Sequence, residues 1–349
     1  MQKMSLGSIK NGYDIVVVGG GASGCSFLYH LNGQIYSVLL VDYRSFPRRK
    51  ACSGILVNQG KEFLQSMPKP KGIFAKPKNL DFIYEDWDSN LQKKVKKGFI
   101  NTYRYKLDNW LFDLLKTKDA QFLENTKLVD FSFTKDKKFI ILFLESNGEI
   151  RTILTRYLVG CDGAMSAVRK KMSNRQIPMY VAIQETIPGF KIKEAHFIFD
   201  KEVTDFYSWL IPKDNAVEIG SAVSPFKAKE KFDLFKQKVF EKTGITGKGV
   251  LESAIVLRPS SVSDFFLGKN NVFLCGEAAA LITPSAAEGI SNALRSGKFC
   301  AEAFNENPKN PFPLYAKKTS VIIKRLSEKL EKSTLISHKE KRKKLIIGV

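Results

Sequence analysis

The sequence is poor in the residues on which hydrolytic and metal-dependent enzymes commonly rely. Only three histidines occur in 349 residues, at His30, His196 and His338, and none lies beside a plausible nucleophile or metal partner. The five cysteines are widely spaced, and no two of them form a CxxC pair. These absences argue against His-dependent hydrolysis, a zinc site and a disulfide framework, and we predict no metal site.

Long apolar runs are also absent. No stretch approaches the roughly 18 uninterrupted apolar residues of a membrane span, and residues 1–11 lack the apolar core of a secretory signal. Hydrophobic residues make up 44% of the chain and charged residues 26%, which is ordinary globular composition. We therefore predict a cytoplasmic protein with two domains or one large α/β body, and not a structural protein.

Positive charge is in excess, with 56 Lys and Arg against 35 Asp and Glu and a formal net charge of +21. Much of the excess lies in residues 317–344, and the remainder is spread thinly. The lysines within 69–78 and 93–97 flank proline or glycine, and we interpret both segments as solvated turns. Nucleic acid is not an expected partner, because no basic motif interleaved with aromatic residues is present.

Residues 314–332 carry apolar side chains at near-helical spacing among lysines, namely Leu314, Val321, Ile322, Leu326 and Leu330. This pattern predicts a basic amphipathic helix. The helix either docks on the protein body, which is the interpretation we favour, or lies on an anionic bilayer. The second alternative would make the protein a peripheral partner of the inner face of the membrane.

Strand and helix signals follow one another in an order typical of nucleotide-binding domains. Residues 14–18 and 37–41 are predicted strands, and a predicted helix at 22–31 lies between them. Residues 138–145 and 150–161 form a predicted hairpin. This first part of the chain therefore has the order strand, tight turn, helix, strand.

The second half of the chain looks like an insertion followed by a return to the first domain. Residues 196–223 contain apolar runs broken at 212–215, which predicts antiparallel sheet. Residues 271–275 are again a predicted strand, and we expect the segment from there through Phe304 to be mostly helical. An inserted sheet therefore interrupts a nucleotide-binding domain whose last strand and helix come late in the chain.

A glycine-rich turn joins the first strand to the first helix. Residues 19–24 match GxGxxG, with Gly19, Gly21 and Gly24 in the required places, and Asp42 ends the next strand about 20 residues later. Gly19 permits the sharp turn, Gly21 lets the backbone approach a pyrophosphate, and Gly24 allows close packing of helix on strand. The helix N-terminus favours phosphate and the carboxylate can accept bonds from ribose hydroxyls, so we predict a bound dinucleotide.

Two later motifs indicate which dinucleotide is bound. Residues 161–169 carry DGxxSxxR after a strand, with Asp162 and Gly163 at its start. Residues 274–280 carry Gly276 and Glu277, and AEGI follows at 287–290. Residues 161–169 resemble the second fingerprint of the para-hydroxybenzoate hydroxylase-like flavoproteins, and residues 274–290 resemble the third.

This resemblance implies FAD as the cofactor. In that family the third motif is usually Gly-Asp-Ala-Ala, and its Asp meets the flavin ribitol, whereas Glu277 keeps the carboxylate on a side chain one methylene longer. Arg104, in the segment RYKLDNWL, is similar to the Arg of the family's RxxLD segment, which contacts the cofactor. The implied fold class is α/β, a Rossmann-like FAD-binding domain with an inserted antiparallel β-sheet substrate domain and C-terminal helices.

The domain boundaries follow from the same resemblance. We expect a discontinuous FAD-binding domain at 11–75, 100–175 and 265–304, a substrate-binding β-sheet domain at 76–99 and 176–264, and a basic helical C-terminal segment at 305–349. The residues predicted to bind the cofactor are Gly19, Gly21, Ala22, Ser23, Gly24, Asp42, Tyr43, Lys50, Cys52, Ser53, Arg104, Asp162, Gly163, Gly276, Glu277, Ala287, Glu288, Gly289 and Ile290.

Within this superfamily the finer resemblance is to the geranylgeranyl reductases. Residues 49–54, RKACSG, look like the KxCGG segment that lies beside the isoalloxazine, with Ser53 in place of Gly. Residues 207–212, YSWLIP, look like the YxWxFP strand that lines the substrate cavity. The resemblance implies catalytic roles for Cys52, Tyr207 and Trp209. The structural alternatives are that Trp209 belongs to the sheet core and that Cys52 is a small buried hydrophobe.

The implied activity is FAD-dependent reduction of C=C bonds in a prenyl lipid or related isoprenoid, with electrons from NAD(P)H or a ferredoxin. Because no histidine is suited to supply the proton, we expect water or an acid near Cys52, Tyr207 or Glu288 to supply it.

Two alternatives stay open. The YSWLIP strand also resembles the WxWxIP pattern of flavin-dependent halogenases, so the enzyme could be a flavin-dependent monooxygenase or halogenase acting on an aromatic substrate. A halogenase usually needs a dedicated lysine, for which Lys69, Lys71 and Lys76 are candidates. The third hypothesis, a non-catalytic flavin-binding or membrane-docking protein, is disfavoured by the intact set of cofactor motifs.

Overall fold

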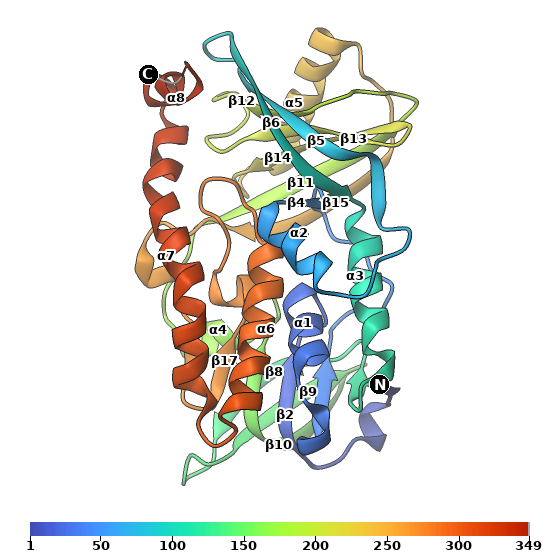
Figure 1. Cartoon of the computed structure of the whole chain (residues 1–349), viewed down its shortest axis with the longest axis vertical. Helices are drawn as coiled ribbons and strands as arrows, with labels where there is room; N and C mark the ends of the chain where they lie inside the picture. Colours follow the sequence, from blue (N-terminus) through green and yellow to red (C-terminus); the bar gives the residue numbers. More distant parts are fainter. Residues whose placement is uncertain (348–349) are drawn as a thin grey trace.

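The computed structural model describes residues 1–347, and two β-sheets with eight α-helices form its frame (Figure 1). The first sheet has nine strands and is parallel at its centre, where β2, β3, β7, β10 and β17 pair in parallel. In spatial order its strands are β1 (Gln2–Lys3), β7 (Gln121–Leu123), β3 (Val38–Val41), β2 (Gly12–Val18), β10 (Glu149–Gly160), β17 (Val272–Leu274) and β16 (Gly268–Lys269). In addition, β9 (Ile140–Ser146) pairs with β10, and β8 (Lys127–Phe133) pairs with β9.

The second sheet has eight strands and lies above the first in Figure 1. In spatial order its strands are β15 (Val250–Leu257), β11 (Met179–Pro188), β14 (Ala216–Val223), β13 (Ser208–Lys213), β12 (Ala195–Phe199), β5 (Phe74–Asp86), β6 (Leu91–Thr102) and β4 (Ile55–Leu56). Every neighbouring pair is antiparallel except β12 and β5, which run parallel. The α/β fold class predicted from the sequence is confirmed, with that one parallel pair as a difference.

The helices are α1 (Ala22–His30), α2 (Asn58–Gln65), α3 (Arg104–Asp113), α4 (Ala167–Met172), α5 (Ala228–Thr243), α6 (Ile290–Glu306), α7 (Pro311–Ser337) and α8 (Lys339–Ile347). Helices α1 and α6 pack so closely that a Cβ on Gly297 would come within 2.2 Å of the Ser23 carbonyl oxygen. The strands beneath them are apolar along their length, and Ile15, Val16 and Val17 are fully buried, as expected for a central parallel sheet covered on both faces.

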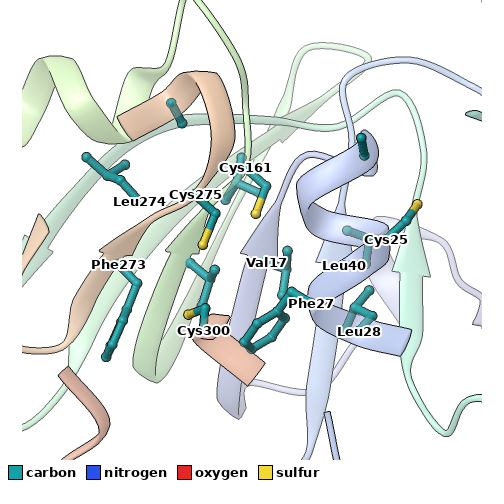
Figure 2. Packing of buried hydrophobic residues seen from close by; sticks show 14 of the residues in the cluster. Val17, Cys25, Phe27, Leu28, Leu40, Cys161, Phe273, Leu274, Cys275 and Cys300 are labelled. Atoms are coloured by element: carbon teal, nitrogen blue, oxygen red, sulfur yellow. The ribbon is translucent and has the colours of Figure 1, made fainter. Parts of the chain in front are cut away.

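All five cysteines are free thiols. Figure 2 shows Cys161, Cys275 and Cys300 gathered where the ends of β10 and β17 meet α6, among side chains such as Val17 and Phe273. The hydroxyl of Tyr315 on α7 contacts the Cys275 sulfur at 3.4 Å. These cysteines pack as small core residues, which agrees with the absence of a disulfide framework in the sequence.

The predicted amphipathic helix docks on the protein body, as favoured from its sequence. Ile322 and Leu326 of α7 are fully buried, and the Tyr315 hydroxyl donates a hydrogen bond of 2.6 Å to the Leu274 carbonyl oxygen in the first sheet. Val321, which the sequence placed on the apolar face, instead points outward and is 51% exposed. Within residues 1–347, no helix has the length and apolar character needed to cross a membrane.

Two local predictions differ from the structure in part. The segment through Phe304 is mostly helical, as predicted, but its α-helix begins only at Ile290, because Ala280 and Ala287 take left-handed backbone conformations that interrupt it. The lysines at 93–97 lie within strand β6, and those at 76 and 78 within β5, whereas turns were predicted. Partners distant in the sequence impose the strand, since β6 pairs with both β5 and β4.

The C-terminal helix α8 is fastened to the second sheet by one buried cation. The guanidinium of Arg342 donates bonds of 3.0 Å to both carboxylate oxygens of Asp86, which is fully buried at the end of β5, and a further bond to Asp88. It also donates to the Ile336 carbonyl oxygen at 3.0 Å.

We predict that Arg342→Leu destabilises the protein by about 3–5 kcal/mol, because it leaves the buried Asp86 carboxylate without its counter-charge. Thermal unfolding followed by circular dichroism measures the effect, and Lys341→Leu, at an exposed position of the same helix, is the matched control. Equal melting temperatures for the two variants would contradict the prediction.

Candidate flavin site

A cleft of about 690 Å³ lies between the two sheets, at the carboxyl ends of β2, β3 and β10. It brings together motifs that are far apart in the sequence, from the glycine turn to the start of α6. Of the predicted cofactor residues, those lining the cleft are Gly19, Gly21, Ala22, Ser23, Asp42, Tyr43, Lys50, Cys52, Ser53, Arg104, Asp162, Gly163, Glu277, Ala287, Gly289 and Ile290.

The remaining three predicted residues lie next to the cleft. Gly24 and Gly276 pack behind it, since a Cβ on Gly276 would press on Ser23, and Glu288 lines a second cavity that adjoins the cleft. Both Tyr207 and Trp209 also line the cleft, from the face of the second sheet.

The glycine turn has the backbone that its sequence requires. Gly19 has φ of +104°, and a Cβ there would lie 2.4 Å from the Cys161 carbonyl oxygen. A Cβ on Gly24 would lie 2.0 Å from the Gly19 carbonyl oxygen, so neither position has room for a side chain. Helix α1 therefore starts directly against the sheet, with Gly21 as its N-cap residue and its N-terminus at the cleft.

Asp42 is held rigidly at the end of β3. Its carboxylate accepts hydrogen bonds from the backbone N–H of Gly20 at 2.7 Å and of Arg44 at 2.9 Å. The side chain is buried but lines the cleft. A fixed carboxylate at this edge is suited to accept bonds from ribose hydroxyls.

One carboxylate oxygen of Asp162 is hydrogen-bonded, and the other has no hydrogen-bond partner within residues 1–347. Its Oδ2 accepts a bond of 2.8 Å from the Ala167 N–H at the start of α4, whereas Oδ1 is buried without a hydrogen-bond partner within residues 1–347. Burial raises the pKa of this carboxyl group above its ordinary value. A buried acceptor facing a cleft fits a ligand that brings hydroxyl groups, as FAD does.

Arg169 ties the second and third motifs together. Its guanidinium donates bonds of 3.0 Å to the carbonyl oxygens of Glu277 and Ala278 and a further bond to that of Ala164. The Glu277 side chain, which departs from the usual Asp, accepts a bond of 3.0 Å from the Leu257 N–H on β15, and its other oxygen lies 3.4 Å from Lys50 Nζ. The longer side chain thus spans from β15 to Lys50.

The segment around Cys52 is clamped by a residue that the sequence analysis missed. Lys213, at the end of β13, is buried, and its Nζ donates bonds of 2.6 Å to the Ser53 carbonyl oxygen, 2.7 Å to Asn101 Oδ1 and 2.8 Å to the Thr102 carbonyl oxygen. Burial lowers the pKa of Lys213. This contact could not be predicted from the sequence, because no local pattern links position 213 to position 53.

A buried carboxyl group lies on the same face of the second sheet as Lys213. Burial raises the pKa of Glu218 to about 7; the Lys213 charge lowers it and the Glu252 charge raises it further. The indole ring of Trp209 packs flat against Gly220, where a Cβ would come within 2.2 Å of the ring. Trp209 is only 5% exposed, so it is part of the sheet core and also part of the cleft wall.

Arg104 and Arg48 flank one buried carboxylate. Arg104 Nε donates a bond of 2.6 Å to Asp108 Oδ1, and the Arg48 guanidinium lies 3.9 Å from the same carboxylate. Both arginines line the cleft, and the contact of Arg104 with the cofactor stays a prediction. Arg48 was missed, although its place shortly after the strand that ends at Asp42 was a usable signal.

A second cavity of about 460 Å³ adjoins the cleft and shares Cys52, Ser53 and Tyr207 with it. Its walls carry the aromatic side chains Phe82, Tyr84, Phe99, Phe197 and Phe199. The ring of Phe82 meets those of Phe99 and Phe197 edge-on, each at 5.0 Å between centroids.

Comparison with known proteins agrees with this geometry. Residues 12–184 match the family model described as an FAD binding domain. A geranylgeranyl bacteriochlorophyll reductase-like protein from Thermoplasma acidophilum has the same fold, with a TM-score of 0.77 at 18% identity over 97% of this chain and 91% of that one. So does PqsL, a probable FAD-dependent monooxygenase from Pseudomonas aeruginosa, with a TM-score of 0.74 at 14% identity over 97% and 99% of the two chains. Residues 12–184 therefore form an FAD-binding domain, and the chain has the fold of the para-hydroxybenzoate hydroxylase-like flavoproteins.

The chain is also similar in sequence to bacterial proteins along nearly its whole length. Protein CbrA of Shigella flexneri serotype 5b (strain 8401) is 30% identical over 333 residues, which cover 93% of this chain and 90% of that protein. Protein CbrA of Escherichia coli O9:H4 (strain HS) matches at the same identity and coverage. The chain belongs to the CbrA family.

We predict that Gly24→Ala weakens FAD binding roughly tenfold, because the added Cβ would push α1 away from the Gly19 turn. The flavin absorbance retained per polypeptide after dialysis measures the loss. Gly7→Ala is the matched control, since a Cβ at Gly7 meets nothing within 4 Å. Full retention of FAD by Gly24→Ala would show that the close approach is not required.

Glu218 gives a prediction about pH. An acid whose pKa rises on folding keeps its proton in the native state where the unfolded chain has already lost it, so its contribution to stability falls as pH rises from its ordinary value of 4.5 to about 7. Glu218→Gln removes this titration.

Relative to the unchanged protein, Glu218→Gln should gain up to roughly 3 kcal/mol of unfolding free energy between about pH 5 and pH 8. Melting temperatures measured across this range test the prediction. Glu230→Gln, at an exposed position on α5, is the matched control. A difference between Glu218→Gln and the unchanged protein that stays constant across this pH range would refute the assigned titration.

Proposed function

We propose that this flavoenzyme reduces C=C bonds in a prenyl lipid of the geranylgeranyl type or in a related isoprenoid. The observation that carries the proposal is the apolar, aromatic-walled second cavity, which meets the flavin cleft at Cys52 and Tyr207. The aromatic part of this wall is suited to contact a hydrocarbon chain. The similarity in fold to a geranylgeranyl bacteriochlorophyll reductase-like protein supports the same substrate class.

The cofactor and the chain have separate tasks in this proposal. Bound in the cleft and reduced by NAD(P)H or a ferredoxin, FAD supplies the hydride. The predicted cofactor residues hold it through the glycine turn, the Asp42 and Asp162 carboxylates and the loop braced by Arg169. Trp209 forms part of the cleft wall, as Tyr207 does.

The proton that completes alkene reduction has three candidate sources on the chain. Cys52, Tyr207 and Glu288 all line the second cavity. Burial raises the pKa of Tyr207, so its hydroxyl keeps its proton at neutral pH, and it donates a bond of 2.7 Å to the Ala286 carbonyl oxygen. Glu288 is paired with Arg325 at 3.3 Å, while its Oε1 is buried without a partner within residues 1–347. Cys52 and Tyr207 lie where the second cavity meets the flavin cleft, and we take this as the reacting end of the cavity.

A flavin-dependent monooxygenase or halogenase acting on an aromatic substrate is the second candidate. CmlS, a flavin-dependent halogenase, shares the fold with a TM-score of 0.69 at 17% identity, over 92% of this chain and 63% of that one. The lysines considered for that chemistry, Lys69, Lys71 and Lys76, lie outside the lining of both cavities. This placement favours the reductase.

The two candidates are separated by reducing the purified yellow protein without oxygen and adding a polyprenyl lipid. We expect the lipid to reoxidise the flavin and to gain two hydrogens for each bond reduced, as measured by absorbance and mass spectrometry. Reoxidation by oxygen alone, with a hydroxylated or halogenated product, would overturn the reductase assignment. Cys52→Ala should slow the anaerobic reoxidation while the flavin stays bound, whereas Cys300→Ala, in the core, should leave the rate unchanged.

A further inference from the structure

The second cavity is apolar along most of its wall but basic at one end. Besides its aromatic residues it is lined by Lys93 and Lys97 of β6 and by Lys332 of α7. Two elements that are more than 200 residues apart in sequence thus bring their lysines to the same cavity.

Only some of the lysines of β6 line the cavity. Lys93 and Lys97 do so together with Val95 and Phe99. Lys94 and Lys96 are not part of the lining, and Lys94 is paired with Glu194.

The lysines that line the cavity have no carboxylate within ion-pair distance in the part of the chain that is described, residues 1–347. Arg342, which also lines the cavity, is already neutralised by Asp86 and Asp88. Lys332 faces other cations: its pKa is lowered first by burial and then by repulsion from Lys329 and Lys97. Uncompensated positive charge of this kind is stabilised by a bound anion.

The basic end and the reacting end of the cavity lie at opposite ends of β6. The last residues of β6, Ile100 and Asn101, pair with β4, which follows directly after Cys52 and Ser53. Lys93 and Phe99 pair with Tyr84 and Leu80 of β5, which are four residues apart, or about 13 Å along that strand. An elongated molecule with its anionic group at the lysines would therefore extend its apolar chain toward Cys52.

We propose that Lys93, Lys97 and Lys332 bind the phosphate monoester head group of an amphiphile whose apolar chain fills the second cavity. A phosphate monoester carries a charge of roughly −1.5 to −2 at neutral pH and offers three acceptor oxygens, which suits a cavity lined by several lysines without carboxylate partners. The inference rests on the proposed function in taking a lipid chain as the occupant. It adds the charge and the orientation of that lipid: the head group lies away from the flavin cleft and the chain lies toward it.

The test uses binding and requires no turnover, so a saturated ligand serves. Calorimetric titration of the FAD-loaded protein with decyl phosphate and with decanol should show much tighter binding of the phosphate, and added salt should weaken it. Lys332→Gln and Lys97→Gln should each weaken decyl phosphate binding roughly tenfold and leave decanol binding unchanged. Lys96→Gln, at a lysine of β6 that does not line the cavity, is the matched control and should bind decyl phosphate as the unchanged protein does.

Three results would overturn the proposal. The first is equal affinity for decanol and decyl phosphate. The second is equal weakening by Lys96→Gln and Lys332→Gln, which would indicate only a general surface field. The third is competition by inorganic phosphate at the concentration at which decyl phosphate binds, which would assign the lysines to free phosphate. If decyl phosphate binds as expected but a prenyl phosphate is not reduced, the head-group site stands and the proposed reaction fails.

Discussion

A buried guanidinium holds together the two loops on which the flavin site depends. Arg169 is 6% exposed, and the carbonyl oxygens of Ala164, Glu277 and Ala278 satisfy its donors. Burial lowers the pKa of Arg169, the Asp162 and Glu277 charges raise it, and the three carbonyl oxygens replace hydrogen bonds that the buried guanidinium loses from water. The DGxxSxxR motif thus has a structural role as well as a place in the cleft: it fixes the loop that carries Glu277.

The parts of the site that depend on local backbone geometry were readable from the sequence. A left-handed turn at Gly19 and a contact at Gly24 that excludes any side chain are requirements on single positions, so glycine at those positions identifies the turn. Asp42 was found because the strand before it and the spacing from the turn fix its place. The fold class followed from the same local patterns, read in order along the chain.

The parts that depend on distant partners were not readable. Lys213 holds the Ser53 carbonyl oxygen from a strand that begins more than 150 residues later, and nothing near either residue indicates the contact. The lysines of β6 looked like a turn, because their strand conformation comes from pairing with β5 and β4. Residues 253–256 of β15 line the cleft without forming any motif. A fold class can therefore be predicted more fully than the wall of a cavity built between two sheets.

The C-terminal segment joins the two halves of the molecule, as the long red helix in Figure 1 shows. Its first turns are anchored on the parallel sheet through Tyr315, and its last helix on the antiparallel sheet through Arg342. Between these two anchors, Lys332 and Ile336 complete one side of the second cavity. A chain ending before Pro311 would lose both anchors, uncover the core around Tyr315 and leave the second cavity open to water along that side.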